Sequence, residues 1–197
     1  MLRVLLAVFV ILTPAYVAAG EPLFDAATKG DTAAIEQLLA KGEAVDARAP
    51  DQATPLIAAA LAGQLEASKL LLAKGAYVMA RNSGGFTALH AAAYSGSAPV
   101  ASLLLDNKAV LEDAANKAGT TPLFVAAEMN HPEVVELLIA KGADPGRLEA
   151  HGYSAMTRTF WKGHKDMVRL LKRHGLKCQE GNILTASDYT QCLAINQ

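Results

Sequence analysis

The sequence lacks the motifs that mark common enzyme active sites. It contains no phosphate-binding glycine loop, no HExxH pair of metal ligands and no nucleophile elbow. Cysteine is scarce as well, because only Cys178 and Cys192 are present, and with His174 alone nearby they offer too few ligands for a metal site. The sequence therefore predicts a protein that is not an enzyme and that binds no metal or cofactor.

Net charge is nearly absent too, at −1 with neutral histidines, but this balance hides an asymmetry. Residues 20–146 contain nine Lys or Arg and fifteen Asp or Glu, whereas residues 147–177 contain eight Lys or Arg and two Asp or Glu. We interpret the basic segment mainly as a solvated end of the domain, with Lys172 and Arg173 suited to a helix C-terminus. The alternative is a patch that meets an acidic partner or an anionic surface. The basic residues are Arg147, Arg158, Lys162, Lys165, Arg169, Lys172, Arg173 and Lys177.

A block of sequence returns every 33 or 34 residues. Each copy has Thr or Ser followed by Pro or Ala, then an alanine-rich helix, a break, and a second helix with larger apolar residues. Clear copies begin at Thr54, Thr87, Thr121 and Ser154. A fixed period of this length is typical of a solenoid, in which each repeat packs mainly on its neighbours.

The threonines are predicted to start helices. In Thr54-Pro55 and Thr121-Pro122 the threonine suits the N-cap and the proline suits the first helical position, where no N–H is needed. Gly or Asn between the helices tolerates the left-handed conformation that ends a helix. Lys108 replaces glycine at the end of one second helix and is a weak point in the pattern.

These motifs resemble the ankyrin repeat. The resemblance implies an all-α solenoid of about five helix pairs joined by short finger loops, with a role in binding another protein. It also implies that His90 hydrogen-bonds to neighbouring backbone. The matching residues are Thr87-Ala88-Leu89-His90, Ala92-Ala93 and Gly96 in one copy, and Thr121-Pro122-Leu123, Ala126-Ala127, His131, Val134-Val135, Leu137-Leu138 and Lys141-Gly142-Ala143-Asp144 in the next.

The predicted repeat domain covers residues 20–176, and a C-terminal tail covers residues 177–197. Repeats are expected to start near residues 21, 54, 87, 121 and 154. The first copy lacks the Thr-Pro opening, and the last has Thr157, Arg158, Thr159 and Phe160 where apolar residues and alanines are expected. We interpret both as caps, because terminal repeats need a polar outer face.

Residues 1–19 are predicted to form a signal peptide. One basic residue, Arg3, precedes an apolar run, and small residues end the segment. Cleavage is expected after Ala19, with cleavage after Gly20 as an alternative. An uncleaved anchor is less favoured, because the apolar run is short and Pro14 interrupts it. We therefore expect an exported monomer, periplasmic or else extracellular, with no stable membrane span after cleavage and no nucleic-acid partner.

Export changes the meaning of the two cysteines. In an oxidising compartment, Cys178 and Cys192 in one short tail indicate a disulfide. The closed loop would contribute about 3 kcal/mol in the chain-entropy model. Two free thiols are the alternative. A short helix from Ser187 to about Ile195 is expected, and the tail is expected to pack against the last repeat.

The period also predicts a binding surface on the concave face, made by finger loops and the exposed side of each first helix. Large apolar groups on an exposed face are typical of interaction surfaces, and Trp and Tyr are enriched among binding hot spots. The alternative is that some of them pack between repeats or under the tail. The candidate partner-binding residues are Phe86, Tyr94, Lys117, Glu128, Met129, Tyr153 and Trp161.

The predicted layout resembles that of small exported bacterial ankyrin proteins. The leading hypothesis is a non-catalytic binding module in the bacterial envelope that serves as scaffold or accessory protein for an envelope enzyme. A periplasmic immunity or inhibitor protein against a toxin is one alternative. A secreted effector that binds host proteins is another.

Overall fold

A computed structural model describes residues 22–179 and 185–195, so the predicted signal peptide lies outside the described residues. This part of the chain contains eleven α-helices and no strand, apart from one isolated β-bridge between Leu148 and Ser154. None of the described helices has the length and apolarity that crossing a bilayer requires. The prediction of an all-α architecture is confirmed.

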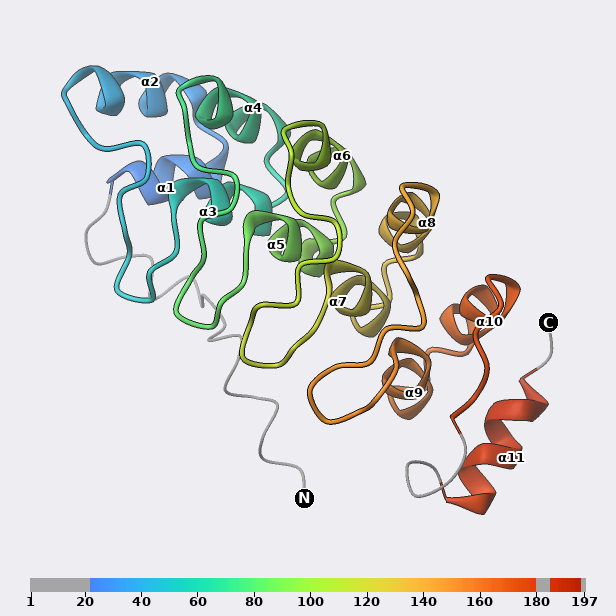
Figure 1. Cartoon of the computed structure of the whole chain (residues 1–197). Coiled ribbons are helices and arrows are strands. Elements are labelled where there is room, and N and C mark those ends of the chain that lie inside the picture. Colours follow the sequence, from blue (N-terminus) through green and yellow to red (C-terminus); the bar gives the residue numbers. More distant parts are fainter. Residues whose placement is uncertain (1–21, 180–184, 196–197) are drawn as a thin grey trace.

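Ten of the helices form five antiparallel pairs, stacked in one row (Figure 1). Each first helix packs on the first helix of the next repeat, and the second helices form a parallel row beside them. The first helices are α1 (Pro22–Lys29), α3 (Pro55–Leu61), α5 (Ala88–Ser95), α7 (Pro122–Glu128) and α9 (Ala155–Trp161). The second helices are α2 (Thr32–Ala40), α4 (Leu65–Ala73), α6 (Ala98–Asp106), α8 (Pro132–Ala140) and α10 (Lys165–Arg173).

The starts of α3 and α7 follow from their threonine caps. The hydroxyl of Thr54 accepts the N–H of Ile57 at 3.3 Å, and that of Thr121 accepts the N–H of Phe124 at 3.2 Å. Both helices have proline in their first turn, where an N–H would have no acceptor within the helix. Local sequence therefore fixes where each of these first helices begins.

The two helices of each pair contribute side chains of different size to the core. The first helices carry fully buried alanines that allow close approach, such as Ala59, Ala92 and Ala126. In the last four repeats the second helices supply a large apolar residue at one equivalent position that is fully buried, whereas Leu38 of the first repeat is partly buried. The four fully buried residues are Leu71, Leu104, Leu138 and Leu171. Burying a leucine side chain contributes about 1.5–3 kcal/mol, so this column is a major source of stability.

The second helices end in a left-handed residue, which is usually glycine, as at Gly75 and Gly142. Lys108 holds the same position after α6 and has a φ of 70°. A residue with a Cβ in this conformation costs roughly 1–2 kcal/mol. The structure thus places strain at the residue that breaks the sequence pattern.

The loops between repeats form fingers, and backbone hydrogen bonds join neighbouring fingers into a ladder. The N–H of Ser83 donates to the carbonyl of Asp51 at 2.7 Å. The equivalent bonds run from Lys117 to Gly84 at 3.0 Å and from Ala150 to Ala118 at 2.9 Å. In the first finger the matching donor position is Pro50, which has no N–H. Pro50 therefore cannot donate a ladder hydrogen bond to a finger before the first.

Neighbouring fingers approach so closely that one position, residue 85, requires glycine. Gly85 has a φ of 87°, and a Cβ on it would lie 2.7 Å from the Cα of Asn116 in the next finger. Any larger residue would push the two fingers apart. The fingers are therefore packed elements of the fold as well as surface loops.

The C-terminal tail contains the disulfide that the sequence predicts, between Cys178 and Cys192, with Cα atoms 6.2 Å apart. It also contains the expected helix, α11 (Ala186–Ala194), which starts at a Thr185 cap. Figure 1 shows α11 beside the last repeat, at the end of the row. The expectation that Thr157 and Thr159 belong to a polar outer face is wrong, because both are fully buried.

Candidate functional site

The candidate site is the surface formed by the finger loops and the last turns of the first helices. Four residues occupy equivalent positions at the ends of α3, α5, α7 and α9. They are Leu61, Tyr94, Glu128 and Trp161. The first three are partly buried, whereas the indole of Trp161 is 44% exposed.

Trp161 is held in place by the last finger. Its ring meets Tyr153 edge to face, with centroids 5.0 Å apart and an angle of 73° between the planes. The guanidinium of Arg158 lies 4.8 Å from the centre of the Tyr153 ring on its face, which adds a cation–π attraction. An aromatic group fixed in this way loses little further freedom when a partner covers it. We call Tyr153, Arg158 and Trp161 the aromatic end of the surface.

A buried carboxylate organises the finger beneath this aromatic end. Glu149, with its side chain 1% exposed, accepts the backbone N–H groups of His151 at 3.0 Å and Tyr153 at 3.2 Å. Its other oxygen lies 2.8 Å from Nδ1 of His151 and 3.7 Å from the guanidinium of Arg158. The carboxylate therefore sets the conformation of the loop that carries Tyr153.

Glu149 was not predicted as a functional residue, although the sequence contains a signal for it. Asn82 and Asn116 occupy the same position in earlier fingers, and each accepts two backbone N–H groups in the same way. All three residues stand three positions before a left-handed glycine. An acceptor side chain at that spacing, repeated every 33 or 34 residues, is the pattern that predicts such a turn.

The other candidates differ in exposure. Glu128 forms an ion pair with Lys162 of the next repeat, at 3.5 Å. Lys117 is exposed at its finger, while Tyr94 and Met129 are half-buried and pack against the core. Glu128, Met129, Tyr153 and Trp161 thus lie on the last two repeats, whereas Tyr94 and Lys117 belong to the third.

The expectation that Phe86 is exposed is wrong. Its side chain is 3% exposed and packs edge to face on His90, with ring centres 5.4 Å apart. Phe86 immediately precedes the cap of α5, at the base of a finger, and the equivalent Thr120 is buried as well. A position enclosed between neighbouring fingers is part of the core, so Phe86 offers no surface to a partner.

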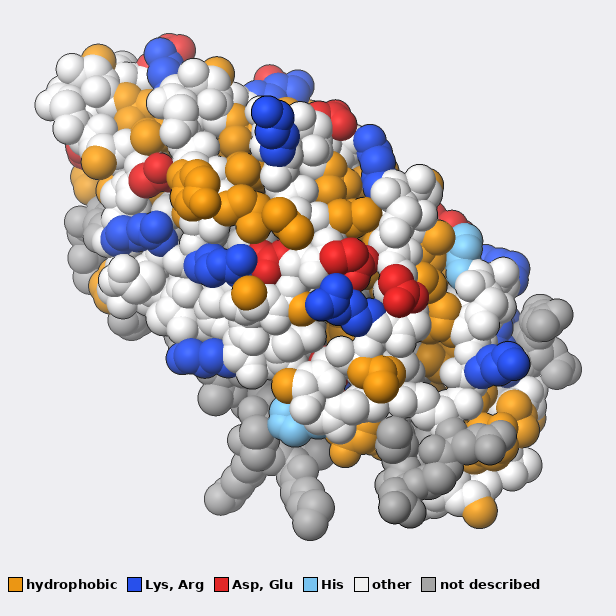
Figure 2. All heavy atoms as spheres, in the orientation of Figure 1, with side chains coloured by type: hydrophobic (Ala, Val, Ile, Leu, Met, Phe, Trp, Pro, Cys, Tyr) orange, Lys and Arg blue, Asp and Glu red, His pale blue; other side chains and the backbone are white. Residues whose placement is uncertain are grey.

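Contacts between repeats join part of the basic segment to acidic residues that precede it. Arg147 lies 3.3 Å from Glu112, and Lys162 lies 3.5 Å from Glu128. Nε2 of His174 lies 2.8 Å from a carboxylate oxygen of Glu136. Each pair joins the basic last segment to the acidic repeat before it. On the face drawn in Figure 2, basic and acidic side chains are interspersed. This arrangement favours the interpretation of the basic segment as structural.

Lys172 has a role that the sequence did not predict. Its ammonium donates to backbone carbonyls at the end of α11, those of Cys192 at 2.7 Å and Ile195 at 2.8 Å, and not to the end of its own helix. Partial burial lowers the pKa of Lys172 below its ordinary value.

His90 joins two repeats within the core. Its Nδ1 accepts the N–H of Thr87 at 3.3 Å and lies 2.9 Å from the Thr87 hydroxyl. Burial lowers the pKa of His90, and the Arg81–Asp113 ion pair nearby has opposing effects on it. The ring is therefore neutral. It performs the backbone-bonding role that the family resemblance implies for this position.

Stacked helix pairs and a ladder of fingers define a helical-repeat protein. The family model for ankyrin repeats (three copies) matches residues 23–115 and 108–182. The chain belongs to the ankyrin repeat family, whose members generally act as protein-binding modules and are typically non-catalytic.

Two curated relatives contain similar repeats within far longer proteins. The chain is 36% identical over 61 residues to ankyrin repeat and SAM domain-containing protein 6 of Mus musculus, which covers 30% of this chain and 7% of that protein. It is 34% identical over 70 residues to an ankyrin repeat and KH domain-containing protein of Caenorhabditis briggsae, which covers 36% of this chain and 3% of that protein. The chain thus spans less than a tenth of the length of either relative.

Proposed function

We propose that this protein is an exported, non-catalytic binding module that captures another protein on its finger and first-helix surface. The observation that carries the proposal is Trp161, which is 44% exposed yet fixed against Tyr153. Exposed tryptophans that are already ordered make efficient anchors, because little side-chain entropy is lost on binding.

The surroundings of Trp161 fit an anchor within a polar rim. The Glu128–Lys162 pair lies on one side, and Lys117 is exposed on a neighbouring finger. Apolar anchors surrounded by polar groups are the usual arrangement of a protein-binding hot spot. Phe86, being buried, is not part of this surface.

The signal-peptide pattern of residues 1–19 supports the proposed compartment, the bacterial envelope, with a mature protein that begins at Gly20. The disulfide is compatible with an oxidising compartment. There the protein acts as a monomeric scaffold or accessory protein for an envelope enzyme. An immunity protein against a toxin and a secreted effector remain the alternatives, and the identity of the captured partner distinguishes them.

The test compares two exposed aromatic residues. Partners are captured from the envelope fraction with wild-type protein, identified by mass spectrometry, and their affinities measured by calorimetry. Trp161→Ala is expected to weaken binding by about 30-fold, which is roughly 2 kcal/mol. The control is Tyr77→Ala, because Tyr77 is 60% exposed but lies in the loop after α4. Equal affinity of Trp161→Ala and wild type would contradict the proposal.

A further inference from the structure

The last finger is closed by a side chain from the tail. The amide nitrogen of Gln179 donates to the carbonyl of Gly152 at 3.0 Å, beside the carbonyl that a sixth finger would use. The amide oxygen accepts the N–H of Ser154 at 2.7 Å and the hydroxyl of Thr157 at 2.5 Å. One glutamine therefore satisfies groups that the next repeat would otherwise cover.

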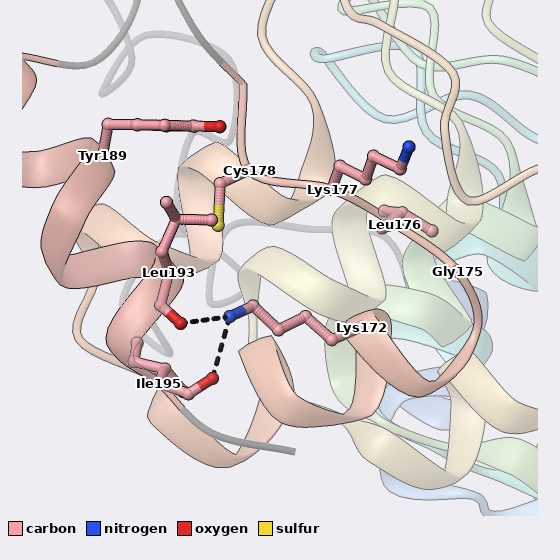
Figure 3. Close-up of a pocket in the computed structure, with 8 residues that line it drawn as sticks. All are labelled: Lys172, Gly175, Leu176, Lys177, Cys178, Tyr189, Leu193 and Ile195. Atoms are coloured by element: carbon pink, nitrogen blue, oxygen red, sulfur yellow. Dashed lines mark hydrogen bonds between the residues drawn. The ribbon is translucent and has the colours of Figure 1, made fainter.

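Two attachments hold this tail to the last repeat. The disulfide joins Cys178, the neighbour of Gln179, to Cys192 on α11, and both cysteines are buried. Lys172 donates to carbonyls at the end of α11, and Figure 3 shows its ammonium between those of Leu193 and Ile195. A cation at a helix C-terminus is favourable, because the exposed carbonyls carry partial negative charge.

The non-covalent attachment is weak without the disulfide. Helix α11 has nine residues, fewer than an isolated helix needs to be stable in water. Among its described residues only Cys192 is buried. Tyr189 and Ile195 pack against the core but are only partly buried. The bond through Cys192 is therefore the one fully buried link from the described residues of α11 to the core.

The disulfide borders an opening. A pocket of about 760 Å³ is lined by Cys178 together with two lysines and apolar residues of α11 (Figure 3). Lys172 and Lys177 are the two lysines. Nearby positive charge stabilises thiolates, and thiol–disulfide exchange passes through them.

We propose that the tail is a redox-sensitive cap that takes the place of a sixth repeat and orders the aromatic end of the binding surface. A thiolate of a dithiol reductant attacks the Cys178 sulfur and forms a mixed disulfide, while Cys192 leaves as a thiolate and takes up a proton. The second thiol of the reductant then releases Cys178 as a thiol, and the reductant becomes a disulfide. Two electrons pass to the protein, and α11 and Gln179 detach.

Reduction loosens the loop that carries Tyr153, because Gln179 bonds to Gly152 and Ser154 on either side of it. Trp161 packs on Tyr153 and loses its support in turn. The effect of reduction on partner binding rests on the proposed function. The existence of the redox-sensitive cap does not rest on it, and the cap is tested without any partner.

Hydrogen exchange of the Ser154 amide in the full mature chain is the decisive measurement, because that amide donates to Gln179. Exchange is expected to rise at least tenfold when dithiothreitol is added, while the Lys117 amide, in the ladder between interior fingers, changes by less than twofold. Fluorescence of Trp161, the single tryptophan, is expected to shift to longer wavelength. Unchanged Ser154 exchange in protein shown to be fully reduced would overturn the proposal.

Two variants test the roles of Gln179 and of the disulfide separately. Gln179→Ala in oxidised protein is expected to speed Ser154 exchange while the amides of α11 keep their protection. Cys178→Ser with Cys192→Ser is expected to reproduce the reduced state without reductant. If Ser154 exchanges at the wild-type rate in Gln179→Ala, the glutamine does not close the finger and the proposal fails. The reductant experiment on wild type stands even where the double variant does not fold.

Discussion

Nε2 of His90 lies 3.0 Å from the carbonyl oxygen of Thr120, so one buried imidazole joins the third repeat to the start of the fourth. Because Nδ1 accepts an N–H from Thr87, the proton resides on Nε2, which donates it to Thr120. Protonation of the ring would remove the acceptor that Thr87 uses. The contact between these repeats therefore depends on a neutral histidine.

The free energy of unfolding is expected to decrease as the pH is lowered, because of this histidine. Its pKa in the folded protein is lowered by burial, whereas in the unfolded chain it is about 6.5. Above about pH 6.5 both states are neutral. Below it the unfolded chain takes up a proton first, which costs the fold up to about 1.4 kcal/mol per pH unit until the folded pKa is reached.

Urea unfolding of wild type and His90→Gln between pH 7.5 and 5 measures this effect. The stability advantage of wild type is expected to shrink as the pH falls. An advantage that grows towards low pH would show that His90 is charged in the fold.

Phe86→Ala is expected to destabilise the protein by about 3–5 kcal/mol, because it removes a buried ring from the contact with His90. Lys117→Ala, on an exposed finger residue, should change the free energy of unfolding by less than about 0.5 kcal/mol. Chemical denaturation measures both. A small effect of Phe86→Ala would mean that the base of the finger is not packed.

Lys108→Gly is expected to stabilise the protein by up to about 1 kcal/mol, since it relieves a left-handed conformation at a modest cost in chain entropy. Lys74→Gly is the matched control, one position earlier in its repeat, where φ is −85°. It should destabilise by about 0.5–1 kcal/mol. If urea unfolding shows that both changes destabilise the protein equally, Lys108 is not strained.

Leu104→Ala is expected to cost about 2–5 kcal/mol, because Leu104 is fully buried in α6. Coupling between repeats is local, so amide exchange should increase in α4 and α8, which pack on α6, more than in α1. Leu105→Ala, at a partly buried neighbour, should cost less. Uniform loss of protection along the chain would instead indicate all-or-none unfolding.

The fold could be predicted from the sequence because its information is periodic. Thr54 and Thr121 are local caps, and Leu71, Leu104 and Leu138 recur at one position, so every copy reinforces the same interpretation. Export, by contrast, rests on the signal-peptide pattern alone. It stays a prediction.

The site was less predictable, because exposure depends on what lies beside a residue. Phe86 and Tyr153 occupy equivalent positions, yet only Tyr153 lies in the final finger, where no further repeat covers it. Gln179 and Lys172 act across the boundary between the repeats and the tail. No period points to such contacts, and only the folded arrangement brings these groups together.

Pro50 and Gln179 together bear on how this array can change in length. A repeat added before Pro50 would meet a finger without the N–H that links each finger to the one before it. A repeat added after the fifth would have to displace Gln179 from Gly152 and Ser154. Duplication of an interior unit between Thr54 and Ser154 disturbs neither end. Growth or shortening of the protein is therefore expected to be tolerated in the middle of the chain and resisted at its two ends.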